Sequence, residues 1–176
     1  VSCRRSAQGN TLAFFYNTAE VIEPTPGIYW LNLLDANQVY RAMSDYLVFD
    51  IAFRPDGMQM AVGARHLNSP DQGLFILDFV TGEFQNLLNL EHVSNIIWKP
   101  DGQYLAMIGK TPEQDQPSWM IVHIDTGLIT SQVPVNMDHV SSNSSNLTPN
   151  ILLPPPDFPA WTWGVDLLNS QNRFNM

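Results

Sequence analysis

Two stretches of the sequence decide the fold, residues 52–57 (AFRPDG) and residues 97–102 (IWKPDG). Each is soon followed by an apolar-Ala-apolar triplet, at residues 60–62 and 105–107, and Gly57 and Gly102 lie 45 residues apart. A weaker copy, SAQG, ends at Gly9, which lies 48 residues before Gly57. A fixed period of roughly 20–50 residues is typical of repeat architectures. The sequence therefore indicates three successive copies of one unit.

A second landmark repeats with the same period. Strand-like runs at residues 29–34, 74–79 and 119–124 end in the turn residues DAN, VTG and DTG, whose last members are spaced by 45 residues. Pro-Asp-Gly alone would prove little, because Pro sets φ, Asp caps a turn and Gly accepts positive φ in many turns. Two independent landmarks with the same period are strong evidence that the chain contains a true repeat.

Each unit divides into four short segments that are rich in apolar, β-branched and aromatic residues. In the middle copy these are residues 48–55, 59–65, 74–80 and 83–88, separated by turn signals. The run LFIL at residues 74–77 is apolar on both faces, which is typical of a strand buried on both sides. Four strands per unit form the blade of a β-propeller.

The sequence thus predicts an all-β chain, a partial β-propeller of three recognisable four-stranded blades with an irregular C-terminal tail. The predicted blades occupy residues 1–137, divided at about 1–47, 48–92 and 93–137. A doubly wound α/β fold is excluded, because no amphipathic stretch of ten or more residues is evident.

Over residues 1–137 the repeat resembles that of the TolB-type, WD-repeat-like β-propeller family. That family's repeat is written around an aromatic residue, a basic residue or Ser, Pro-Asp-Gly and a following apolar-Ala-apolar strand, as in residues 53–57 and 98–102. The first copy departs from it, since Arg5 takes the aromatic position and Ala7 and Gln8 replace Pro-Asp. The resemblance implies the fold and an extracytoplasmic location, periplasmic or at the cell surface. It does not imply an activity, because propellers host many functions.

After Val135 the period fails. Residues 138–141 (DHVS) resemble residues 91–94 (EHVS), as though a fourth blade were opening, but Ser, Asn and Pro follow. We expect a Ser/Asn- and Pro-rich linker at 138–160, and a further strand or docking tail at 161–176. The 176 residues hold about 3.9 periods, whereas propellers close with roughly four to eight blades. The prediction is part of a propeller, completed by further sequence, another chain or an irregular fourth blade.

Charge and composition exclude several classes of function. The chain has 8 Lys and Arg against 17 Asp and Glu, a net charge of −9, which opposes nucleic acid as a partner. Its single cysteine, Cys3, excludes an intrachain disulfide and a multi-cysteine metal site. No apolar run approaches the roughly 20 residues of a membrane span, so we expect no transmembrane segment.

The direction of the strands assigns the turns to two faces. Strands alternate in an antiparallel blade, so the Pro-Asp-Gly and Asp-Thr-Gly turns share one face. The longer connections at residues 17–27, 65–73 and 110–118 share the other, where repeat scaffolds usually place binding. This second face is rich in Asp and Glu, which indicates a site for a basic segment of a partner protein or, less readily, a divalent cation. The alternative is an ordinary solvated surface. The candidate partner-binding residues are Arg65, His66, Asp71, Lys110, Glu113 and Asp115.

No residue is predicted to be catalytic, to bind a cofactor or to bind a metal. Asp56, Gly57, Asp101 and Gly102 are interpreted as structural turn residues. The histidines, His66, His92, His123 and His139, lack metal-ligand spacing. Trp30, Trp98 and Trp119 fall in predicted strands and are expected in the core, whereas Trp161 and Trp163 leave a sugar platform as a minor alternative.

The first functional hypothesis is a noncatalytic propeller, a scaffold that presents a loop-built face to a protein partner. The alternative is a regulatory propeller segment of a larger prolyl-oligopeptidase-like hydrolase, which would carry its nucleophile in another domain. A third possibility is a structural subunit of a larger complex, held by the Pro-rich arm.

Overall fold

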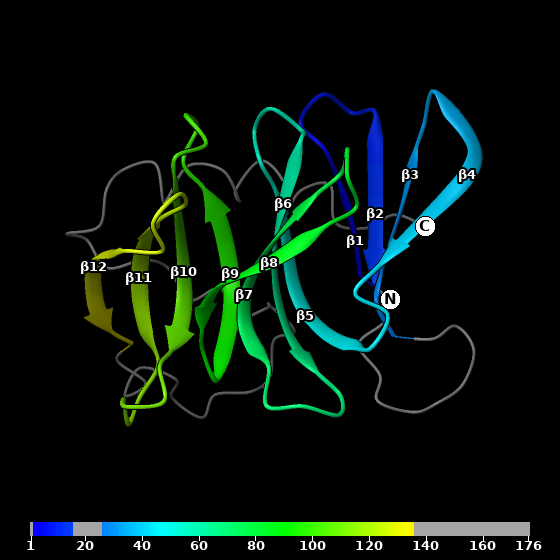
Figure 1. Cartoon of the computed structure of the whole chain (residues 1–176). Helices are drawn as coiled ribbons and strands as arrows, with labels where there is room; N and C mark the ends of the chain where they lie inside the picture. Colours follow the sequence, from blue (N-terminus) through cyan, green and yellow to red (C-terminus); the bar gives the residue numbers. More distant parts are fainter. Residues whose placement is uncertain (1, 16–25, 136–176) are drawn as a thin grey trace, which may run out of the picture.

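The computed structural model describes residues 2–15 and 26–135 as three four-stranded antiparallel sheets (Figure 1). Blade 1 contains β1 (Ser2–Arg5), β2 (Thr11–Phe15), β3 (Ile28–Asn32) and β4 (Asp35–Ala42). Blade 2 contains β5 (Tyr46–Phe53), β6 (Gln59–His66), β7 (Gln72–Asp78) and β8 (Phe84–Asn89). Blade 3 contains β9 (His92–Trp98), β10 (Tyr104–Lys110), β11 (Ser118–His123) and β12 (Ile129–Pro134). The strands lie in chain order within each sheet, which is the order of a propeller blade, and the all-β class is confirmed.

The predicted strands of the middle copy match β5 to β8 to within two residues at each end. The predicted linker at 138–160, the predicted tail at 161–176 and most of the connection at 17–27 lie outside the described residues. Within the described ranges, no helix is long and apolar enough to cross a membrane.

The turn predicted at residues 35–37 is wrong. In blade 1 the chain turns at Leu33 and Leu34, and β4 already begins at Asp35. The side-chain Oδ1 of Asn32, the last residue of β3, accepts the backbone N–H of Leu34 at 2.9 Å, which starts the turn directly after this strand. Because Asn32 begins the turn early, the period that locates the third turn in blades 2 and 3 misplaces it in blade 1.

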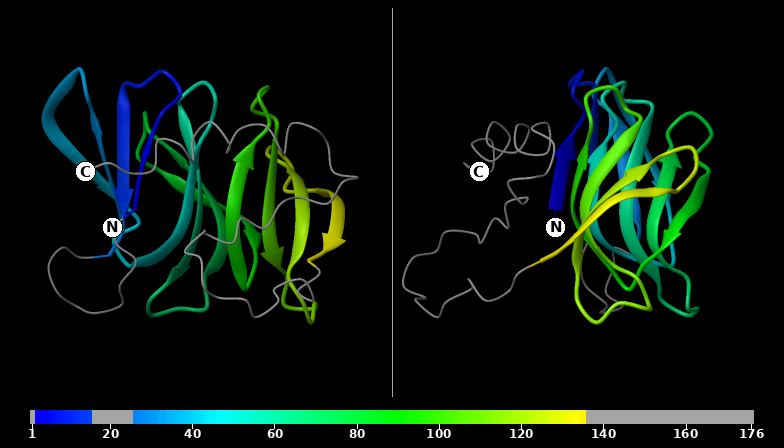
Figure 2. Two further views of the ribbon diagram at one scale, coloured as in Figure 1. Left: turned by 180° about the vertical axis from the view of Figure 1, so that it is seen from behind. Right: turned by 90° about the vertical axis from the view of Figure 1, so that its left-hand side faces the viewer.

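The blades stand side by side (Figure 2). Buried apolar side chains fill the layers between them. Strand β7 shows how blade 2 contributes to both layers. Phe75 and Leu77 lie in the layer shared with blade 1, while Leu74 and Ile76 lie in the layer shared with blade 3. All four side chains are at most 3% exposed, as the both-face apolar pattern predicts. The buried tryptophans Trp30, Trp98 and Trp119 belong to these layers and to the outer face of blade 3.

A glycine lets blade 3 approach blade 2 closely. A Cβ placed on Gly63 in β6 would lie 2.9 Å from the Cβ and Cγ1 of Val93 in β9. Real Cβ atoms do not approach that closely, so β9 occupies the space that a side chain would need. Gly63 is therefore a packing requirement of the interface between these two blades.

Polar contacts also join the blades near their inner strands. The carboxylate of Asp50 in β5 accepts the backbone N–H of Ile96 in blade 3 at 3.0 Å. Its Oδ1 also lies 3.6 Å from the guanidinium of Arg4 in blade 1. The indole Nε1 of Trp98 donates to the backbone oxygen of Ala52 across the same boundary at 2.8 Å. One carboxylate thus links blade 2 to both of its neighbours.

The substitution Gly63→Ala tests the close approach of the blades. We expect it to lower the free energy of unfolding by about 1–3 kcal/mol, because β-branched Val93 and its backbone cannot yield easily. Urea denaturation followed by circular dichroism measures the effect.

The matched control is Gly109→Ala in β10. A Cβ there meets the flexible ends of Met120 at 3.0 Å and Leu90 at 3.3 Å, so we expect a smaller loss. Equal losses for the two variants would contradict this account of the interface.

Candidate binding site on the long-loop face

The connections between strands divide the molecule into two ends. The Pro-Asp-Gly turns, at the upper end in Figure 1, join the first and second strands of blades 2 and 3; we call this end the short-turn face. The longer connections, residues 67–71 between β6 and β7 and residues 111–117 between β10 and β11, lie at the opposite end, together with the corner at residues 90–91. We call this end the long-loop face.

On the short-turn face the predicted turn residues form tight turns. Gly57 and Gly102 have φ values of 73° and 71°, in the left-handed region that favours glycine. Asp56 Oδ1 accepts the N–H of Met58 at 2.9 Å, and Asp101 Oδ1 accepts that of Gln103 at 3.0 Å.

A cation lies beside each of these two aspartates. Arg54 lies 3.4 Å from the Asp56 carboxylate and Lys99 lies 2.8 Å from that of Asp101. The hydrogen bond from Lys99 lowers the pKa of Asp101. The two carboxylates thus hold separate turns in successive blades and do not form a pair.

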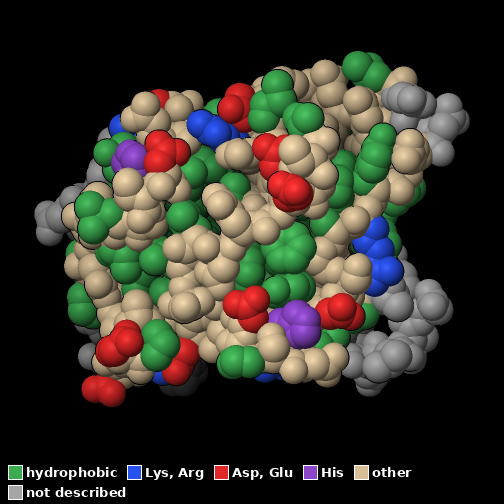
Figure 3. Space-filling model, in the orientation of Figure 1, with side chains coloured by type: hydrophobic (Ala, Val, Ile, Leu, Met, Phe, Trp, Pro, Cys, Tyr) green, Lys and Arg blue, Asp and Glu red, His purple; other side chains and the backbone are tan. Residues whose placement is uncertain are grey.

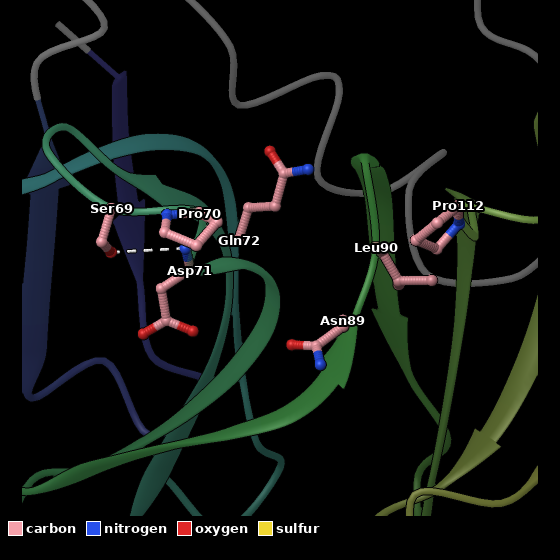
Figure 4. Close-up of a pocket in the computed structure, with 7 residues that line it drawn as sticks. All are labelled: Ser69, Pro70, Asp71, Gln72, Asn89, Leu90 and Pro112. Carbon is pink, nitrogen blue, oxygen red and sulfur yellow. Dashed lines mark hydrogen bonds between the residues drawn. The ribbon is translucent and has the colours of Figure 1, made fainter.

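The long-loop face contains an open hollow of about 510 Å³ between blades 2 and 3 (Figure 4). One side is the end of the β6–β7 loop and the start of β7; the other is the end of β8, the following corner and the β10–β11 loop. Polar and apolar groups alternate around it. The lining residues are Ser69, Pro70, Asp71, Gln72, Asn89, Leu90 and Pro112.

Among the residues that the structure describes, Asp71 is the one ionisable residue that lines this hollow, and its carboxylate is held from two sides. Tyr46 Oη donates to Oδ2 at 2.9 Å, and the Asn86 amide donates to Oδ1 at 3.3 Å. Asn86 also donates to the side-chain oxygen of Asn89 at 2.9 Å. Strand β5 and strand β8 thereby orient a carboxylate that the loop supplies.

The loop that carries Asp71 is closed by its own backbone. His66 N–H donates to the Asp71 carbonyl at 2.7 Å, and Asp71 N–H donates to Ser69 Oγ at 3.3 Å (Figure 4). His66 Nδ1 accepts the N–H of Asn68 at 3.0 Å. Although Ser, His and Asp occur within six residues, these bonds do not connect them as a nucleophile, a base and an orienting acid.

The β10–β11 loop is built around Gln114. Its side-chain oxygen accepts the N–H of Thr111 at 2.9 Å, and its side-chain nitrogen donates to the hydroxyl of Ser118 at 3.3 Å. Ser118 is 3% exposed, so the loop is fixed to the start of β11. Pro112 at the edge of the hollow is carried by this fixed loop.

The structure brings together only part of the predicted partner-binding set. Asp71 lines the hollow, and Glu113 and Asp115 are exposed on the loop that supplies its far side. Lys110 pairs with Glu91, which lies in the corner that borders the hollow. Neither residue at the end of β6 lines it: Arg65 is exposed, and the His66 ring packs edge-on against Tyr46 at 4.9 Å.

Several residues of the site carried no usable signal in the sequence. Asn86 and Asn89 look like ordinary polar residues of an outer strand, and Gln72 and Pro112 like loop residues. They matter because two blades place them around one hollow. Tyr46 lies 25 residues from Asp71 in the chain, and no motif links the two.

Acidic side chains occur along both the upper and the lower edges of the molecule (Figure 3). The surroundings of these acidic side chains differ between the two ends. Those of the Pro-Asp-Gly turns accept amides of their own turns and pair with adjacent cations, whereas Glu113 and Asp115 make no side-chain hydrogen bond or ion pair with any residue in the described ranges. Within those same ranges, no three His, Cys, Asp or Glu residues are grouped closely enough to hold a metal ion.

The bond from Tyr46 to Asp71 predicts a stability change at alkaline pH. Burial, together with that hydrogen bond, raises the pKa of Tyr46 from 10.0 to about 12. A phenol with a higher pKa in the folded chain stabilises the fold below pH 10 and loses that contribution as the pH rises through about 12. We therefore expect the wild-type chain to lose more unfolding free energy between pH 8 and pH 11 than Tyr46→Phe does, as measured by urea denaturation.

Tyr40→Phe is the matched control, because Tyr40 is 43% exposed and lies in blade 1. It should follow the wild-type pH dependence. If Tyr46→Phe also followed it, the assigned role of the Tyr46 hydroxyl would be wrong.

No family model matches the sequence, and no curated protein matches it. Solved structures match it clearly. TolB from Acinetobacter baumannii superposes with a TM-score of 0.56 at 21% identity, over 77% of this chain and 33% of that one. The β-propeller domain of the Trilobed protease from Pyrococcus furiosus gives 0.59 at 13% identity, over 78% and 43%. Acylaminoacyl peptidase from Pyrococcus horikoshii gives 0.55 at 16% identity, over 76% and 24%.

In each of these matches the chain spans less than half of the solved protein. Identities this low show a common fold, and the matched proteins include both TolB and peptidases. The predicted partial propeller is confirmed, as is the predicted kind of repeat. This chain therefore has the TolB-type β-propeller fold, and its described residues form three four-stranded blades of such a propeller.

Proposed function

We propose that the chain is a noncatalytic propeller module that binds a basic segment of a protein partner on its long-loop face. The observation that carries the proposal is the Asp71 carboxylate, which Tyr46 and Asn86 hold at the hollow between blades 2 and 3. A carboxylate that is already oriented loses less entropy on binding a cation than a mobile one does.

The lining of the hollow suits a Lys or Arg side chain. Pro70, Leu90 and Pro112 offer apolar surface to the methylene stem, while the charged head would donate to the Asp71 carboxylate and the side-chain oxygen of Asn89. Glu113 and Asp115 stand on the adjoining loop and would attract further basic residues. The net charge of −9 favours the approach of a positively charged partner.

The hydrogen bonds of the β6–β7 loop support a binding role over a catalytic one. The His66 ring and the Ser69 hydroxyl accept backbone N–H groups, and the Asp71 carboxylate accepts the Tyr46 hydroxyl. These bonds do not join a general base to a nucleophile. The family resemblance supports an extracytoplasmic location, periplasmic or at the cell surface. Our proposal thus includes both a protein partner and an extracytoplasmic location.

Fluorescence anisotropy with labelled peptides tests the proposed site. We expect a lysine- and arginine-rich peptide to bind, and a matched peptide with Glu at those positions not to bind. The variant D71N/E113Q/D115N should weaken binding about tenfold, which corresponds to roughly 1.4 kcal/mol. Binding should also weaken as salt screens the charges.

Glu83→Gln is the control. Glu83 is exposed directly before β8, on the short-turn face, so this variant should leave binding unchanged. Failure of the basic peptide to bind, or equal binding by the triple variant, would refute the proposal.

A second candidate rests on the peptidase matches. The Trilobed protease and acylaminoacyl peptidase both share this propeller fold, so the chain is alternatively a regulatory propeller segment of a larger prolyl-oligopeptidase-like hydrolase. That candidate predicts that the complete gene also encodes a Gly-x-Ser-x-Gly nucleophile turn. Sequencing the complete gene decides between the two, because such a turn followed by an α/β hydrolase domain would replace the scaffold proposal.

A further inference from the structure

The outer face of blade 3, which points away from blade 2, is buried although no described sheet lies against it (Figure 1). Ile108 is 3% exposed, Trp119 is 2% exposed and Ile121 is 6% exposed. These three form an apolar cluster with Val135, and Tyr104 and Val133 pack against it. Apolar side chains of this size are seldom left in contact with water, so this face requires a cover.

The 45-residue repeat identifies the residues of blade 2 that are equivalent to those of this face. Ile108 occupies the repeat position of Gly63, and Trp119 occupies that of Leu74. On blade 2 these positions face blade 3, and Gly63 leaves the space that Val93 of β9 fills.

The replacement of glycine by isoleucine changes what this face can accept. A strand that approached blade 3 as β9 approaches blade 2 would meet the Ile108 side chain within 2.9 Å of its Cβ, the distance found at Gly63. The larger Trp119 in place of Leu74 raises the surface further. A regular blade cannot pack here in the manner of β9, and the cover must stand farther out or follow a different path.

Chain continuity indicates the occupant. Val135 is the last described residue, is 4% exposed within this cluster and donates its N–H to the Pro117 carbonyl at 3.0 Å. The residues that follow include the apolar run ILL at 151–153, prolines at 154–156, and Phe158, Trp161 and Trp163. Proline has no N–H to pair, so a proline-rich segment suits a cover that does not extend a sheet.

We propose that the C-terminal segment, residues 136–176, packs its apolar side chains on the outer face of blade 3 and replaces a regular fourth blade there. The site is separate from the hollow on the long-loop face and does not depend on the proposed function. The occupant is this segment of the same chain, bound by apolar contact with Ile108, Trp119 and Ile121.

Photocrosslinking in the full chain identifies the occupant directly. With p-benzoylphenylalanine at position 119 in place of Trp119, we expect crosslinked peptides from residues 136–176 within one chain. The same substitution at Leu74 should crosslink to β9, because Leu74 lies in the layer shared with blade 3. Crosslinks between two chains would assign the face to a second copy, and the absence of a crosslink at position 119 would also overturn the proposal.

A smaller substitution provides a second test in case the variant at position 119 does not fold. In a Cys3→Ser background, the thiol of Ile108→Cys should react with a thiol reagent on the order of a hundredfold more slowly than that of Val80→Cys, since Val80 is 78% exposed. Replacing residues 151–153 with serine should speed the reaction at position 108 about tenfold, because the cover would open more often.

The matched control replaces Leu33, Leu34 and Val39 with serine, three exposed apolar residues of blade 1, and should leave the rate unchanged. An unchanged rate after the substitution of residues 151–153, or equal acceleration by the control, would overturn the proposal.

Discussion

The structure depends on the burial of both faces of each sheet against its neighbours. Blade 2 shows this constraint in full, because adjacent residues of β7 enter different apolar layers. A four-stranded sheet with such strands would expose too much apolar surface alone, so no blade is a stable unit by itself. Gly63 sets how closely two blades can meet, and Asp50 adds polar contacts from blade 2 to both neighbours.

This stacking gives the two ends of the blades different chemical tasks. At the short-turn face, carboxylates satisfy the amides of the turns and cations lie beside them, so their charges serve the fold. At the long-loop face, the connections are longer and two blades together line an open hollow. A binding site at this end requires both blades to be in register, which ties the site to the same apolar layer that holds blades 2 and 3 together.

Parts of this arrangement could be predicted because they depend on local chemistry. The Pro-Asp-Gly turns, the alternation of strands and the apolar run of β7 are properties of short segments, and they gave the three blades and the division into two faces. The turn of blade 1 could not be placed from the period, because the Asn32 side chain starts it early. The hollow could be predicted only as a loop-bearing face, since Asn86, Asn89 and Pro112 come from different elements.

The sequence by itself determined the repeat, the strands and the face on which the long loops lie, because turn residues and side-chain alternation act within a few residues. The tertiary structure alone decided that Asp71, of six predicted residues, lines the hollow and that Tyr46 and Asn86 orient it. It also showed that Ile108, at the repeat position of Gly63, lies on a buried outer face. These outcomes depend on distances between strands and blades, which the order of residues along one strand does not specify.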